Sequence, residues 1–271
     1  MNSSQTLPQY KTPPVIEVVC GVQFEPLTNL LSVHFGDFWQ RVKHDYPRAE
    51  DRPPLDDFQE IVQGTKVRAE LVAMDMPPHR RVFYIDSSDN FLLQVQPSRF
   101  HSNWRKERPE DEYPKFEVAF GRFLRGWSTF LDFARGSGFG SPRTNQYELT
   151  YINHIPEGEG EQFPRDIGDY IPAFSWASAQ SSAFLPAPES AGVRMRFMLP
   201  ESKGRLHVTV GHGVRKTDER RIIVLELTAR GSAKPDWADM GEWFALGHEW
   251  IVRGFTDLTS HAAHLKWGRE R

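Results

Sequence analysis

The chain has a single cysteine, Cys20, among its 271 residues, which excludes an intramolecular disulfide and a zinc site built from several thiolates. It also lacks any apolar run of the roughly 18 to 20 residues that a membrane-spanning helix needs. Basic charge is not in excess, because 33 lysines and arginines face 36 aspartates and glutamates, for a formal net charge of -3. Proteins that coat nucleic acid or an anionic membrane are usually more basic. We therefore expect another protein as the partner, with nucleic acid not favoured and no membrane association.

Motifs of common catalytic sites are missing as well. The sequence contains no Gly-x-Ser-x-Gly elbow, no P-loop and no Gly-x-Gly-x-x-Gly turn. Cys20 falls on the apolar side of a predicted strand, beside Val18 and Val22, so we expect it in the core rather than as a nucleophile. These absences favour a binding protein over an enzyme, and we expect no cofactor.

The N-terminal stretch MNSSQTLPQYKTPP is polar and rich in proline, without the basic start and apolar segment of a secretory signal. We expect residues 1–14 to form a flexible segment and the protein to be cytoplasmic. Hydrophobic residues make up 39% of the chain and aromatic residues 13%, which is ample material for a folded core.

Helical and extended patterns alternate along the rest of the chain. Apolar residues recur with helical spacing over 27–46, 115–133 and 240–255, and a short capped helix ends near 264–267. Alternating apolar and polar residues predict about eight strands, joined mainly by short turns and hence mostly antiparallel. The predicted strands are VIEVVCGVQF, KVRAELVA, RVFYID, FLLQVQ, YELTYINHI, VRMRFML, RLHVTV and RIIVLELTA.

The order of these elements predicts an α+β fold with a mostly antiparallel sheet and long amphipathic helices packed on one face. Two halves, 15–136 and 142–271, each give a β-α-β-β-β-α order around one shared core. FLRGW at 123–127 corresponds to IVRGF at 251–255, and IEVVCGVQF corresponds to YELTYINHI. We interpret the halves as a diverged duplication; two unrelated copies of a common β-α-β pattern are the alternative.

A series of motifs runs in order along nearly the whole chain: PPVIEVVCGVQFEPL, LQVQPSRFHSNW, YPKF, YELTYINHI and RGFTDLTSHAAHLKWG. Together they resemble a sporadically distributed bacterial family of uncharacterised proteins. The chain departs from the family pattern at Thr150, where an arginine is expected, and at Pro97. The resemblance implies no particular reaction. The scattered occurrence of the family implies a bacterial defence or toxin-neutralising setting.

Three histidines near the C-terminus, His248, His261 and His264, are the candidates for a metal site. A zinc-protease helix requires His-Glu-x-x-His, but Val252 stands where the second histidine belongs. His261 and His264 are spaced to share a helical face, and a third ligand would have to come from elsewhere in the chain. We therefore expect no metal site here, and interpret the histidines as capping helices or covering aromatic neighbours.

The polar faces of the strands, taken together, predict one broad surface of mixed charge. Three interpretations stay open for it: an exposed face with salt links across strands, a surface for a protein or peptide, or a catalytic groove. The segment SRFHSNWRKER is expected to be a loop between sheet and helix. The residues that we expect to bind a partner are Gln96, Arg99, Asn103, Trp104, Arg194 and Arg196.

The favoured function is a non-enzymatic binding or recognition protein. The alternative is a hydrolase or nuclease-like enzyme with a carboxylate and histidine groove on the polar face. In that case Glu17 and Glu148 would form an acid/base pair, with His154 beside them, provided that their environments separate their pKa values. Self-association through an exposed strand edge is compatible with either function.

Overall fold

A computed structural model describes residues 6–55, 60, 81–156, 166–174, 184, 191–215, 218–233 and 240–270. The strands are β1 (Val15–Phe24), β2 (Arg48–Arg52), β3 (Arg81–Ile85), β4 (Phe91–Gln96), β5 (Arg99–Arg105), β6 (Thr144–Pro156), β7 (Gly192–Met198), β8 (Arg205–Val214) and β9 (Arg221–Ser232). The helices are α1 (Ser32–Val42), α2 (Phe116–Gly136), α3 (Asp166–Tyr170), α4 (Met240–Leu258) and α5 (His261–Lys266), with a 3-10 turn at Pro200–Ser202.

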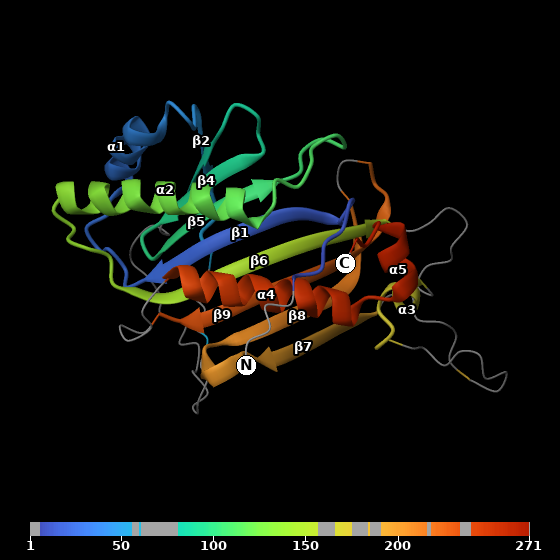
Figure 1. Ribbon diagram of the computed structural model, residues 1–271. Coiled ribbons are helices and arrows are strands. Elements are labelled where there is room, and N and C mark those ends of the chain that lie inside the picture. The colour runs from blue at the N-terminus through green and yellow to red at the C-terminus, as the bar shows by residue number, and fades with distance from the viewer. Residues whose placement is uncertain are drawn as a thin grey trace.

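All the described strands belong to one sheet in the order β2-β3-β4-β5-β1-β6-β9-β8-β7, and every neighbouring pair is antiparallel. The long helices α2 and α4 lie on the same face of the sheet, as Figure 1 shows, with α1 beside α2. The predicted α+β class, with a mostly antiparallel sheet and long helices on one face, is confirmed.

The two halves of the chain meet at the centre of the sheet, where β1 pairs with β6. Outward from this pair the order is β1-β5-β4-β3 in the first half and β6-β9-β8-β7 in the second. Both halves therefore place their first strand innermost and their last strand next to it, and the first half adds β2 at its edge. This order agrees with the predicted pair of related halves, while their origin by duplication stays a prediction.

Two parts of the sheet differ from the sequence prediction, and a third lies outside the described residues. The expected loop SRFHSNWRKER contains β5, which is paired on both sides, with β4 and with β1. The sequence did not predict this strand because its polar residues are buried on one face and its other face is not uniformly apolar. Arg99, His101 and Asn103 alternate with Phe100, Ser102 and Trp104. The short charged strand β2 was not predicted at all, and KVRAELVA lies outside the described residues.

Part of the segment that the sequence predicts to be flexible, residues 9–12, is bonded to the C-terminal end of the chain. Backbone N–H groups of Lys11 and Thr12 donate to the carbonyls of Gly268 and Trp267, and that of Glu270 donates to Gln9. The Tyr10 ring packs against both Phe255 and Trp267, at centroid distances of 5.5 and 6.2 Å. The start of the chain is thus attached to its end.

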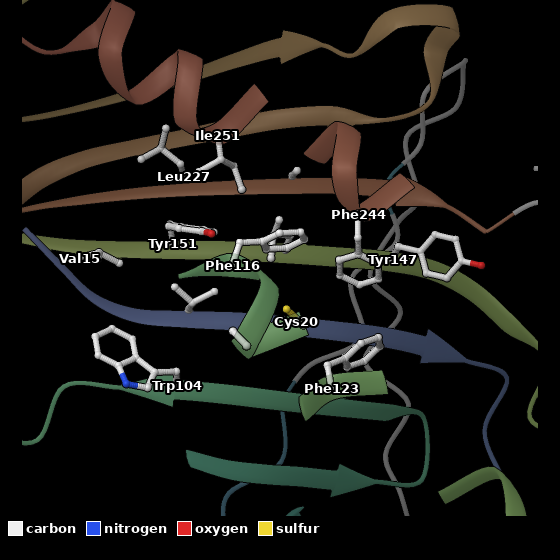
Figure 2. Close-up of a cluster of buried hydrophobic side chains, with 14 of the residues drawn as sticks. Val15, Cys20, Trp104, Phe116, Phe123, Tyr147, Tyr151, Leu227, Phe244 and Ile251 are labelled. Atoms are coloured by element: carbon white, nitrogen blue, oxygen red, sulfur yellow. The ribbon is translucent and has the colours of Figure 1, made fainter. Parts of the chain in front are cut away.

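The core lies between the helices and the sheet and is dominated by aromatic rings. Figure 2 shows Cys20 with Phe116, Phe123, Phe244 and Tyr147, which come from β1, α2, α4 and β6. At the other end of α2, the ring of Phe130 lies 5.5 Å from those of both Phe38 and Phe100 and 5.7 Å from that of Phe24, so it joins α1, α2 and the sheet.

Because Phe130 is 0% exposed and joins three layers of the core, we expect Phe130→Ala to lower the free energy of unfolding by about 3 to 5 kcal/mol. The control on the same helix is Leu124→Ala, whose side chain is 42% exposed and whose loss should cost less than about 1 kcal/mol. Urea unfolding followed by circular dichroism measures both. A similar cost for the two variants would contradict this account of the core.

Candidate functional site

The face of the sheet opposite the helices carries a polar layer, as the sequence predicts, but its middle is buried. Gln23, Gln94, Gln146 and Thr228 all lie at most 8% exposed. Two further residues reach this layer from outside the sheet. The Leu55 N–H donates to Gln96 Oε1 at 3.1 Å, and the Glu60 N–H donates to Gln146 Oε1 at 2.7 Å. The central part of the layer is therefore an interior, and a free partner has no direct access to it.

At the centre of the polar layer, the imidazole of His101 occupies the space that a side chain at position 21 would need. A Cβ on Gly21 would lie 2.5 Å from His101 Cδ2. Gly21 pairs with His101 on one side and with Glu148 on the other, so the absence of a side chain brings the imidazole towards the carboxylate. Burial lowers the pKa of His101 to about 4, against the opposing effect of Glu148. The imidazole is therefore neutral near pH 7.

The carboxylates of the polar layer each have a partner in the described part of the chain. Burial alone would raise the pKa of Glu148, but the charge and the hydrogen bond of Arg230 hold it below its ordinary value. The pKa of Glu60 is also lowered. Burial would raise it, but the hydrogen bonds of its carboxylate with His207 and Arg205 have the larger combined effect. Glu148 and Glu60 are thus each paired with an arginine inside the layer, whereas the Nε atoms of Arg81 and Arg99 in the same layer make no hydrogen bond within the described part of the chain.

Glu17, at the end of the polar layer, has a different environment from Glu148 and Glu60. Burial raises the pKa of Glu17, and the hydrogen bond that Asn103 Nδ2 donates to its Oε1 at 2.5 Å only partly offsets this. Asn103 Oδ1 in turn accepts from Gln94 Nε2 at 2.8 Å. The pKa values of Glu17 and Glu148 are thus shifted in opposite directions, as the enzyme alternative requires.

The register, however, does not bring the three residues of the enzyme alternative together. Glu148 lies opposite Gly21, whereas Glu17 lies opposite Ile152, about 13 Å further along β6 at the usual rise of a strand. His154 is displaced by two more residues and pairs with Val224. The charges acting on Glu17 are those of Arg105, Glu107 and Glu226, whereas those acting on Glu148 include Arg230 and Arg99. The proposed acid/base pair does not exist in this sheet.

The six residues predicted to bind a partner fall into three places. Gln96, Arg99 and Asn103 are buried in the polar layer. Trp104 points to the opposite side of β5, is 2% exposed and packs against Tyr113 at 5.5 Å. Arg194 and Arg196 are exposed on β7. Arg194 and Arg196 are thus on the surface, as the sequence predicts. The segment that was expected to be a loop is the buried strand β5.

The histidines near the C-terminus have structural partners. The His248 ring stacks on Phe116 at 4.2 Å, and its Nδ1 lies 3.1 Å from the Tyr151 hydroxyl. His264 Nε2 lies 2.9 Å from Thr259 Oγ1, whereas His261 is exposed on α5. Among the described residues, no group of three or more histidine, cysteine, aspartate or glutamate side chains is placed to hold a metal ion. Cys20 is buried, and burial raises its pKa, which keeps the thiol protonated.

The two edges of the sheet differ in their chemistry. Edge strand β2 has the sequence RAEDR, and its charges are paired, Arg48 with Asp89 and Arg52 with Glu50. Edge strand β7 has no described strand on its outer side. On the helix side it carries Val193, Met195 and Phe197, the last 39% exposed, and on the other side Arg194 and Arg196, beside Thr209 and His207 of β8. Within the described part of the chain, β7 therefore combines an edge that no strand covers with two exposed arginines.

The neutral, buried state of His101 has a consequence for stability at acid pH. Its folded pKa of about 4 lies below the ordinary value of 6.5, so an unfolded chain takes up a proton between these values while the folded protein does not. The free energy of unfolding should therefore fall as the pH decreases from 6.5 towards 4, by up to roughly 3 kcal/mol from this residue. His248, whose pKa burial also lowers to about 4, acts in the same direction.

We expect His101→Gln to reduce this acid sensitivity: the loss of unfolding free energy between about pH 7 and pH 5 should shrink by about 2 kcal/mol. Urea titrations at the two pH values measure the difference, which is independent of any change in stability at pH 7. The exposed His44→Gln is the control, and it should lose as much stability as the wild type. An unchanged difference in His101→Gln would show that this imidazole is not held neutral.

No helix among the described residues is long and apolar enough to cross a membrane. Comparisons of the chain with protein-family models, with curated proteins and with solved structures found no significant match.

Proposed function

We propose that the protein is a non-enzymatic recognition protein that binds an extended, acidic segment of another protein along edge strand β7. The observation that carries this proposal is that β7 ends the sheet within the described part of the chain, with Arg194 and Arg196 exposed on one face. An exposed edge presents backbone N–H and C=O groups to which an extended peptide can add as a further strand.

The alternation of β7 defines the peptide that it suits. Arg194 and Arg196 are two residues apart, so both point to the side of the polar layer. An added strand would place every second side chain opposite or beside these arginines, where aspartate or glutamate pairs favourably. Its intervening residues would lie on the helix side, beside Met195 and Phe197. The matching segment therefore alternates acidic and apolar residues.

A second copy of the chain suits this edge poorly. If two β7 strands paired antiparallel about Met195, Arg194 of each copy would lie opposite Arg196 of the other, and like charges in directly opposed positions destabilise a strand pair. Shifting the centre to either arginine places that residue opposite itself. The same arginines that attract an acidic segment thus oppose self-association through β7, which favours a different protein as the partner.

The polar layer supports binding over catalysis. Its carboxylates are engaged with Arg230, with Arg205 and His207, and with Asn103, and the middle of the layer is buried. The enzyme alternative requires Glu17, Glu148 and His154 to line one groove, and the strand register keeps Glu17 and Glu148 apart. In the setting implied by the family resemblance, the acidic partner would be a toxin or another component of a bacterial defence system.

Selection from a library of random peptides displayed on phage tests the proposal with defined ligands. We expect the enriched peptides to carry aspartate or glutamate at alternate positions, and the double variant Arg194→Glu/Arg196→Glu to bind them at least about tenfold more weakly, since each favourable pair becomes a like-charge pair. Fluorescence anisotropy with the synthetic peptides measures the affinities.

The matched control is Arg48→Glu/Arg52→Glu, which reverses two arginines on the opposite edge of the same sheet and should leave peptide binding unchanged. Thermal unfolding of each variant shows that the fold is intact. Enriched peptides without an acidic preference, or equal binding by the two double variants, would rule out β7 as the recognition site.

A single charge reversal should turn the repulsion between copies into attraction. In Arg194→Glu, the new carboxylate lies opposite Arg196 of the second copy, and the two-fold symmetry creates this pair twice. At about 0.2 to 1 kcal/mol for each pair, the dimerisation constant should rise by roughly 2- to 30-fold over that of the wild type. Analytical ultracentrifugation measures it. The double reversal restores like charges and should not dimerise, so dimers of both variants would contradict this geometry.

A further inference from the structure

A second surface, far from β7 in the order of the sheet, has the features of a small-molecule site. A groove of about 470 Å³ lies between the C-terminal end of α1, the turn joining β3 to β4, and α2. These elements are seen together beside the first half of the sheet in Figure 1. The residues of the groove that matter for its chemistry are Arg41, Asp45, Tyr46, Asp86, Arg122 and Arg125.

One of these arginines is held rigidly. The guanidinium of Arg122 lies 3.7 Å from the centre of the Phe91 ring and forms an ion pair with Asp86 at 3.6 Å. Asp86 is fixed in turn, because its carboxylate accepts hydrogen bonds from the Ser88 hydroxyl and the Phe91 N–H. A planar guanidinium that is stacked and paired in this way loses little further freedom when it binds a ligand.

The other arginines have hydrogen-bonding capacity to spare. Arg125 follows Arg122 by three residues, so both lie on the same side of α2. It is exposed, and its guanidinium forms no hydrogen bond or ion pair within the described ranges of the chain. Arg41, from the last turn of α1, contributes a third guanidinium that lies 5.7 Å from the ring of Phe133, likewise without an ion pair among the described residues. Against three guanidinium groups, the groove has the carboxylates of Asp45 and Asp86, the second already engaged by Arg122.

We propose that this groove binds the phosphate group of a small phosphorylated metabolite, with the phosphate held between Arg122 and Arg125 and the rest of the molecule lying towards Arg41. The volume is within the usual range of roughly 300 to 1,000 Å³ for small-molecule sites. A phosphate offers several oxygens to more than one guanidinium at once, and the forked donors of arginine match its geometry. The buried side chains of Tyr46 and Leu93 form part of the wall of the groove.

The test uses inorganic phosphate and pyrophosphate as probes in isothermal titration calorimetry of the full chain. We expect saturable binding to the wild type and about 10- to 100-fold weaker binding to Arg125→Ala, the range for losing hydrogen bonds to a charged group. Because Arg125 is exposed and makes no ion pair among the described residues, its removal should leave the thermal midpoint of the unliganded protein unchanged.

Arg135→Ala is the matched control, since Arg135 is an exposed arginine of the same helix that pairs with Asp132 and does not line the groove. It should bind both probes like the wild type, as should Arg194→Glu/Arg196→Glu, so this proposal and the one for β7 are tested separately. Absence of saturable binding to the wild type at millimolar pyrophosphate would overturn the proposal. Equal affinities for Arg125→Ala and Arg135→Ala would do the same.

Discussion

The antiparallel pairing of β1 with β6 is the contact on which the rest of the molecule depends. It joins the two halves of the chain into one sheet, from the pair Val15 and Asn153 to the pair Phe24 and Thr144. Residues far apart in sequence must meet before this ladder can form, and its register then determines which side chains share a row. A shift of one residue would exchange the polar and apolar faces of the strand. Val18, Cys20 and Val22 would then leave the core that α2 and α4 cover.

The same ladder explains the polar layer. Because Gly21 stands between His101 and Glu148, β1 leaves room for an imidazole in the row that contains Arg230. Each charge in this interior has to be matched, since an unpaired buried charge is costly. The pairs of Glu148 with Arg230 and of Glu60 with Arg205 and His207 meet that requirement. Arginines that form no ion pair with any described residue lie elsewhere, on edge strand β7 and in the groove beside α2.

Much of the fold could be predicted from the sequence because the periodicity of side chains reflects burial directly. The apolar spacing of α2 and α4 and the alternation of β1, β6, β8 and β9 are strong local signals. The prediction failed where burial was polar. In β5, the polar residues His101 and Asn103 are at most 5% exposed. Because their residue types are typical of a solvated loop, the sequence predicted a loop there. Edge strand β2 was missed for a different reason. Four of its five residues are charged and none packs in the core, so no apolar alternation marks it.

The sequence by itself determined the α+β class, the helices on one face, the core position of Cys20 and the exposure of Arg194 and Arg196, since each of these follows from local pattern and composition. Only the tertiary structure decided that Glu17 and Glu148 lie about 13 Å apart along the sheet, that Trp104 is part of the core, and that β7 is the last of the described strands at its side of the sheet. Register and strand order arise from pairings between distant segments. No local pattern encodes them, because each depends on which other strand arrives beside it.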